Sequence, residues 1–173
     1  MAITLYDISV ANYLQALNAV GGYLDKGLSH CRDNGIDPEE IVGTSFFPDM
    51  QPFRFQIQSV AHHSLGAIEA IRKSVFYPPS NLPEHGYAEL QTLIANTRET
   101  LQKLAPEEIN GLEGADVIFH IGEAKLPFTA AGFLLSFSLP NFYFHATTAY
   151  DILRSRGVPV GKRDYLGKMR LKK

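Results

Sequence analysis

The sequence predicts an all-α protein, a four-helix bundle with a small β-hairpin between its third and fourth helices. Three observations favour this class. The 173 residues are 45% hydrophobic and 20% charged, which is ordinary for one globular domain. Four segments repeat apolar residues every three or four positions, as amphipathic helices do. A short stretch rich in strand-forming residues lies between the third and fourth segments.

The first helix is expected from about Ile8 to Arg32, where every apolar step is three or four residues. The pair Asn34-Gly35 is a natural helix C-cap, so the helix should end there. The run Asp37-Pro38-Glu39-Glu40 then has an N-cap residue, a proline at N1 and an acidic first turn. It predicts a short second segment of helix.

The second long helix is expected from about Pro52 to Val75, because the prolines of Tyr77-Pro78-Pro79 cannot continue it. The third is expected from about Tyr87 to Leu104 and ends before Pro106.

The fourth long helix is expected to begin with Ser138 as N-cap and to continue to Arg156, before Gly157. The pattern of Ala131–Phe137 fits both a helical turn and extended chain. Before it, Val117–Ile121 and Ala124–Phe128 flank a Gly-Glu turn and predict the hairpin.

Composition narrows the class of protein. Apolar runs are far shorter than the ~20 residues that cross a bilayer, and no basic stretch precedes an apolar one at the N-terminus. The single cysteine, Cys31, cannot form an internal disulfide. We therefore expect one domain over residues 1–173, in the cytoplasm and with no membrane contact.

Charge is unevenly distributed. From Arg154 to Lys173 there are eight Lys/Arg and one acid, so this segment carries +7 and the remainder −9. A basic tail, at about 158–173, could bind phosphates or nucleic acid. A solvated tail is the simpler interpretation, because the acidic remainder would repel a polyanion. Nucleic acid is not an expected partner.

Histidines supply the only chemistry that the pattern suggests. On the fourth helix Asn141 and His145 share the apolar face at i and i+4, the spacing at which side chains converge on a metal. On the second helix His62 and His63 diverge by about 100°, so one could meet His145 and the other face outward. The alternative is a buried hydrogen-bond network without chemistry.

Other catalytic patterns do not occur. The sequence has no acid–His–nucleophile spacing, no Gly-rich phosphate loop and no Cys/His cluster. The remaining histidines, His30, His85 and His120, are expected at a helix end, in a loop and in the hairpin.

Several blocks of sequence resemble a bacterial family of unknown function. They are Pro48–Met50, Gln56–Gln58, Asn141–His145, Thr147–Tyr150 and Gly157–Gly167. That family looks like part of the DinB/YfiT-like superfamily of metalloenzymes. The resemblance implies a four-helix bundle, often a homodimer, with three metal-binding histidines, two of them as His-x-x-x-His on the last helix. Some relatives are thiol-dependent transferases or isomerases using bacillithiol, mycothiol or glutathione.

Carried over position by position, the resemblance makes His145 the second histidine of that pair, and Asn141 stands where the first would be. His62 fits the ligand from the second helix. We therefore expect an altered or degenerate pocket for a divalent metal, Zn or Ni, at His62, His145 and Asn141. His63 and Asp49 are secondary candidates. The pocket would serve a metal- or thiol-dependent transferase or hydrolase, or take a small-molecule ligand, in a homodimer. The alternative is a non-catalytic binding or structural homodimer.

Overall fold

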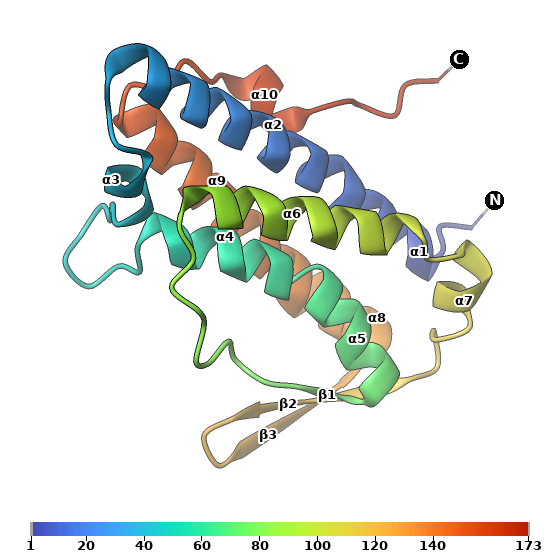
Figure 1. Ribbon diagram of the computed structural model, residues 1–173. Helices are drawn as coiled ribbons and strands as arrows, with labels where there is room; N and C mark the ends of the chain where they lie inside the picture. The colour runs from blue at the N-terminus through green and yellow to red at the C-terminus, as the bar shows by residue number, and fades with distance from the viewer. Residues whose placement is uncertain (1, 173) are drawn as a thin grey trace.

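Four long helical segments run side by side in the computed structural model, which describes residues 2–172 (Figure 1). They are α2 (Val10–Asn34), α4 with α5 (Phe53–His62 and Leu65–Lys73), α6 (Tyr87–Gln102) and α9 (Leu139–Ser155). α4 contacts α6 and α9, and α2 contacts the same two helices, so the four close around one core. The prediction of a mostly helical fold is confirmed.

Short elements complete the chain. The helical ones are α1 (Leu5–Ile8), α3 (Pro38–Val42), α7 (Pro106–Asn110), α8 (Ala130–Phe133), a π-helix (Leu134–Ser138) and α10 (Lys162–Leu166). The strands are β1 (Val75–Phe76), β2 (Asp116–Ile121) and β3 (Ala124–Thr129). Within residues 2–172 no helix is long and apolar enough to cross a membrane.

The predicted hairpin is present as β2 and β3, which pair antiparallel. A third strand was not expected: β1 pairs parallel with β2, with Val75 opposite Ile118. The second long helix therefore does not reach Val75. It ends at Lys73, because Ser74 adopts the left-handed conformation with φ of 56° and turns the chain toward β2.

The second long helix is also interrupted, which corrects the prediction of one continuous helix. α4 ends at His62, and Ser64 leaves helical geometry with φ −111° and ψ −81° before α5 begins. The Ser64 hydroxyl donates to the carbonyl of Val60 at 2.7 Å. Side-chain capture of a backbone carbonyl by serine favours such a bend. The bend places His62 and His63 at the end of a helix.

The last helix begins earlier than predicted. Ser138 is not an N-cap, because its backbone is already helical (φ −67°, ψ −49°) and its side chain caps nothing. Helical backbone instead continues back through the π-helix and α8 to Thr129, whose hydroxyl accepts from Gly132 N. This resolves the segment Ala131–Phe137 as helical.

The ends of the first long helix agree better with the sequence. Gly35 is the left-handed C-cap of α2, with φ of 66°, and the Asp37 side chain caps α3 at Glu39 N. Ser9 divides α1 from α2, a break that the pattern did not predict.

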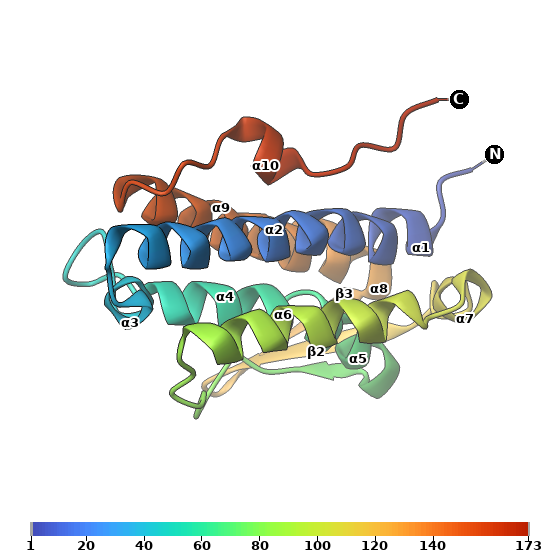
Figure 2. The same ribbon diagram turned by 45° about the horizontal axis from the view of Figure 1, so that its top comes forward.

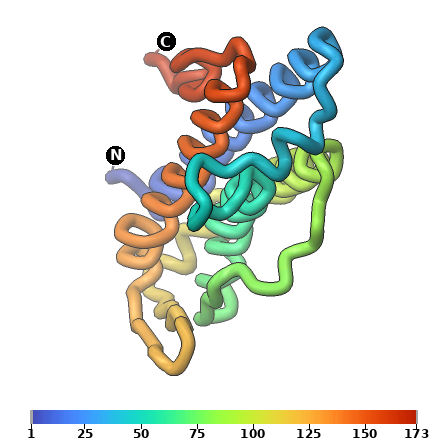
Figure 3. Tube along the Cα trace, turned by 90° about the vertical axis from the view of Figure 1, so that its left-hand side faces the viewer, coloured from blue at the N-terminus to red at the C-terminus, as the bar shows by residue number. Residues whose placement is uncertain are grey.

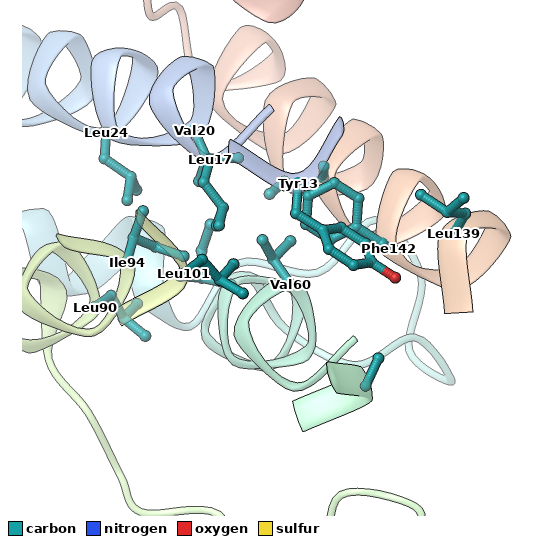
Figure 4. Packing of buried hydrophobic residues seen from close by; sticks show 14 of the residues in the cluster. Tyr13, Leu17, Val20, Leu24, Val60, Leu90, Ile94, Leu101, Leu139 and Phe142 are labelled. Atoms are coloured by element: carbon teal, nitrogen blue, oxygen red, sulfur yellow. The ribbon is translucent and has the colours of Figure 1, made fainter. Parts of the chain in front are cut away.

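Large apolar side chains fill the space between the helices. In Figure 4, Tyr13 and Leu17 of α2 point toward Val60 of α4 and Phe142 of α9. All four are fully buried, and the rings of Tyr13 and Phe142 meet edge to face at 5.0 Å. Each such side chain contributes about 1.5–3 kcal/mol relative to an exposed one. This packing fixes how α4 and α9 face each other.

The basic tail is docked onto the bundle through α10, on the side away from the sheet (Figure 2). Lys26 forms an ion pair with Asp164 at 2.7 Å, and Arg170 donates to Asn12. The tail therefore contacts α2 at α10 and at Arg170, while its described Lys and Arg side chains from 162 to 172 are exposed to solvent. Lys173 lies outside the described residues. Figure 3 shows the C-terminal segment turning back at one end of α9, on the same side of the molecule as the N-terminus.

A substitution at Gly27 tests how closely α2 and α6 pack against each other. A Cβ at this position would collide with the hydroxyl of Tyr87, which donates to Leu24 O at 2.8 Å. We expect Gly27→Ala to lower the free energy of unfolding by roughly 1–3 kcal/mol, as overpacking does. Gly22→Ala is the matched control, since nothing lies within 4 Å of its Cβ position. It should leave stability equal or raise it by about 0.5–1 kcal/mol. Urea unfolding measures both, and equal stability of the two variants would contradict the described packing.

Candidate functional site

Two imidazoles meet where α4 ends beside α9. The ring of His63 stacks on the ring of His145 with centroids 5.7 Å apart and planes 17° apart. His63 is 4% exposed, and His145 is partly buried. Phe55 and Phe144 contact the His145 ring at 5.8 and 5.3 Å. The site is thus a pair of histidines enclosed mainly by aromatic rings.

Gln56 fixes the orientation of His145. The Gln56 amide nitrogen donates to Gln51 O at 2.8 Å, which turns its carbonyl oxygen toward His145. That oxygen lies 2.8 Å from His145 Nδ1. Because an amide oxygen can only accept, Nδ1 carries the proton. The neutral ring then presents its lone pair at Nε2, the arrangement found in metal-bound histidines.

His62 turns away from this pair. Its ring contacts His63 at 5.4 Å, nearly perpendicular, and Phe76 at 4.6 Å. Its Nε2 lies 2.9 Å from the carbonyl oxygen of Tyr77, to which it donates. His63 therefore lies between His62 and His145. The interpretation of His62 as the metal ligand from this helix stays a prediction.

The other two candidate metal ligands are Asn141 and Asp49, and neither is among the residues described above as contacting the imidazole rings. Asn141 is one turn before His145 on α9, and its amide nitrogen donates to Phe137 O at 2.7 Å. Asp49 is exposed in the loop between α3 and α4. In residues 2–172 no three His, Cys, Asp or Glu side chains gather as a metal-ligand set. A metal here would need a ligand of another kind.

Burial makes these imidazoles weak bases. Desolvation, with smaller effects of the neighbouring His62 and His145, lowers the pKa of His63 to about 3. Desolvation, with a smaller effect of His62, lowers the pKa of His145 to about 4. The pKa of His62 is also lowered by desolvation, against the opposing effect of its bond to Tyr77. Neutral imidazole is the form that binds a metal.

One nitrogen of this cluster has no hydrogen bond. His63 Nδ1 is buried without a protein partner, as is the hydroxyl of Ser59 one turn earlier. Buried polar atoms of this kind usually have a partner. The donor set therefore fits a bound metal, because a buried and neutral imidazole nitrogen is left available.

Sequence reasoning missed Gln56, although a signal was present. Gln56 falls within the apolar stripe of α4 that Phe53, Ile57 and Val60 define, and it is 3% exposed. A glutamine at a position whose spacing predicts burial indicates a polar partner inside the protein. No pattern in the sequence indicated that the backbone carbonyl of Tyr77 would accept a hydrogen bond from a histidine.

Comparison with known proteins identifies the family and the fold of this chain. The sequence profile of a family described as a domain of unknown function, DUF1993, matches residues 5–166. The chain belongs to this family. The crystal structure of a DinB family member protein from Shewanella denitrificans is similar, with 25% identity and a TM-score of 0.79. The match covers 98% of this chain and 95% of that one, so the fold is DinB-like over nearly its whole length. No curated protein sequence matches significantly.

Acid is expected to destabilise this DUF1993 protein through the stacked histidines. The folded pKa values of His63 and His145 lie below the ~6.5 of an unfolded chain, so the unfolded state binds more protons below about pH 6.5. With a chelator present to keep the protein free of metal, protonation of these two imidazoles should lower the free energy of unfolding by roughly 2–4 kcal/mol between pH 7 and pH 5.

Urea unfolding across this pH range measures the effect. The control is the double variant His63→Gln/His145→Gln, whose stability should fall less steeply with pH because these two imidazoles no longer titrate. An identical slope in both proteins would show that the imidazoles do not contribute.

Proposed function

We propose that this protein binds a divalent metal, zinc or nickel, through His145 Nε2 and His63. The observation that carries the proposal is the orientation of His145 by Gln56, which directs one imidazole nitrogen away from its hydrogen-bond partner. The membership in a DinB-like fold supports it. The metal would act as a Lewis acid toward a bound thiol or water.

The separation of the two rings is compatible with a shared ion, and binding would turn one of the stacked rings, because each lone pair lies in its ring plane. Imidazoles bound to one zinc through bonds of about 2.0–2.1 Å have ring centres roughly 5–6 Å apart. The centroids of His63 and His145 are 5.7 Å apart. We assign His63 rather than His62 to the pair because His62 Nε2 already donates to Tyr77.

The protein's own groups would orient and desolvate a substrate. Gln56 holds the His145 ring through Nδ1, and the Phe55 and Phe144 rings contact it. Asn141 uses its amide nitrogen on the backbone, which leaves its side-chain oxygen as an acceptor for a substrate proton. This set favours a metal-dependent transferase or hydrolase that accepts a small thiol or activates water.

A second candidate function is structural. The bond between Gln56 and His145 also fits a buried network that joins α4 to α9 and does no chemistry. In that case the same residues would contribute to stability, and metal would have no effect.

Metal analysis separates the two. We expect untagged protein to contain zinc or nickel in about one equivalent by mass spectrometry, and His145→Ala or His63→Ala to lose it. His85→Ala, which changes a histidine outside the cluster, is the control and should retain the metal. Gln56→Leu should weaken affinity 10–100-fold, as loss of a partner behind a ligand does. Protein that is metal-free and shows no thermal shift with either ion would support the structural function instead.

We also propose a homodimer that functions in the cytoplasm. Exposed apolar side chains of α9 and the π-helix support the dimer: Leu135, Tyr143 and Phe144 are 54, 39 and 59% exposed. Apolar surface of this kind marks contact sites between proteins. Light scattering after size exclusion should give twice the 19.2 kDa chain mass. Phe144→Glu should reduce this to one chain mass, and an unchanged mass would contradict the assignment of this face.

A further inference from the structure

A second candidate site lies on the other side of His62. A cavity of about 400 Å³ separates α5 from the extended segment 77–82, which runs from β1 back toward α6 (Figure 1). Pockets for small molecules usually have volumes of 300–1,000 Å³. Gln58 and His62 hold the segment against α4 by donating to the carbonyls of Pro83 and Tyr77. The extended segment that forms one wall of the cavity is therefore held by hydrogen bonds at both of its ends.

His62 presents a hydrogen-bond acceptor to this cavity. Its Nε2 carries a proton, because the carbonyl of Tyr77 can only accept. In a neutral ring Nδ1 then has the lone pair. A Cβ at Gly66 would lie 3.4 Å from this Nδ1, and both residues line the cavity. The absence of a side chain at position 66 thus leaves Nδ1 uncovered.

The rest of the lining is apolar and without net charge. Phe76, Pro78 and Leu82 contribute apolar surface. The two charged residues, Glu69 and Lys73, form an ion pair with each other at 3.1 Å. A charged ligand would have no free counter-ion here, whereas an uncharged one would lose little on leaving water.

We infer that this cavity binds a small, uncharged and mostly apolar molecule that donates one hydroxyl hydrogen bond to His62 Nδ1. An aromatic alcohol fits this description, since a flat ring packs well against the Pro78-Pro79 wall. The site is separate from the proposed metal pair, and its occupation does not need the metal.

The probe for this site is 4-ethylphenol, titrated into the ¹⁵N-labelled full chain at pH 8 with chelator present. An imidazole is neutral at this pH, and chelator separates the result from the metal proposal. We expect saturable shifts at the amides of Gly66, Ala70 and residues 75–82, with affinity in roughly the millimolar range for so small a ligand. 4-Ethylanisole, which lacks the donor, should bind about fivefold more weakly. The anion 4-ethylbenzoate should also bind more weakly.

Gly66→Ala tests the acceptor directly. The added methyl group makes only ordinary contact with His62 Nδ1, so the variant should fold, but it covers this atom. We expect binding of 4-ethylphenol to weaken at least about fivefold. Gly22→Ala on α2, where nothing is near, is the matched control and should bind as the parent does. Absent shifts near Gly66, equal binding of phenol and anisole, or unchanged binding by Gly66→Ala would each overturn the inference.

Discussion

The backbone carbonyl of His63 is the point at which three helices are joined. Ser138 Oγ, at the end of the π-helix, donates to it at 2.7 Å, and Tyr13 of α2 donates to Ser138 at 2.8 Å. All these groups are buried, and a buried carbonyl left without a partner costs about 1–3 kcal/mol. The bond therefore fixes the start of α9 against the end of α4. The stacking of His63 on His145 depends on this register.

The two histidines at the end of α4 lie in different environments. His62 and His63 are consecutive, so their side chains diverge by about 100°. His63 turns toward α9 and the Phe137 ring, and its burial keeps it neutral. His62 turns toward Tyr77 and the cavity beside α5. One bend in one helix thus positions both the proposed metal pair and the proposed ligand cavity.

Periodicity and caps predicted those parts of the fold that depend on local sequence. The body of α2, its end at Gly35 and the hairpin β2–β3 follow from residues that are close in the chain. The bends at Ser9 and Ser64 do not follow from local sequence. In both, the serine hydroxyl donates to the carbonyl four residues earlier, a bond that serine also makes inside unbroken helices. Only packing between helices decides which outcome occurs.

The strand β1 was missed for a related reason. Val75 and Phe76 alone are too short to show a pattern, and they become a strand only because β2, far along the chain, supplies the partner. The candidate site shows the same limit. Sequence spacing indicated that a histidine of the second long helix would approach His145. Helical angles could not choose between His62 and His63, because the two side chains diverge toward opposite edges of the apolar stripe.

Asn141 shows how the site differs from a pair of ligands on one helix. An asparagine at i−4 of His145 would face the same point as the histidine, but here its amide nitrogen is bound to Phe137 O. Phe137 belongs to the π-helix, whose wider turn precedes Pro140, a residue that has no N–H to donate. The amide thus adds a hydrogen bond to backbone where the helix changes its geometry. In our proposal the second imidazole then comes from α4, across the helix interface, and the metal pair depends on tertiary packing that no helical spacing encodes.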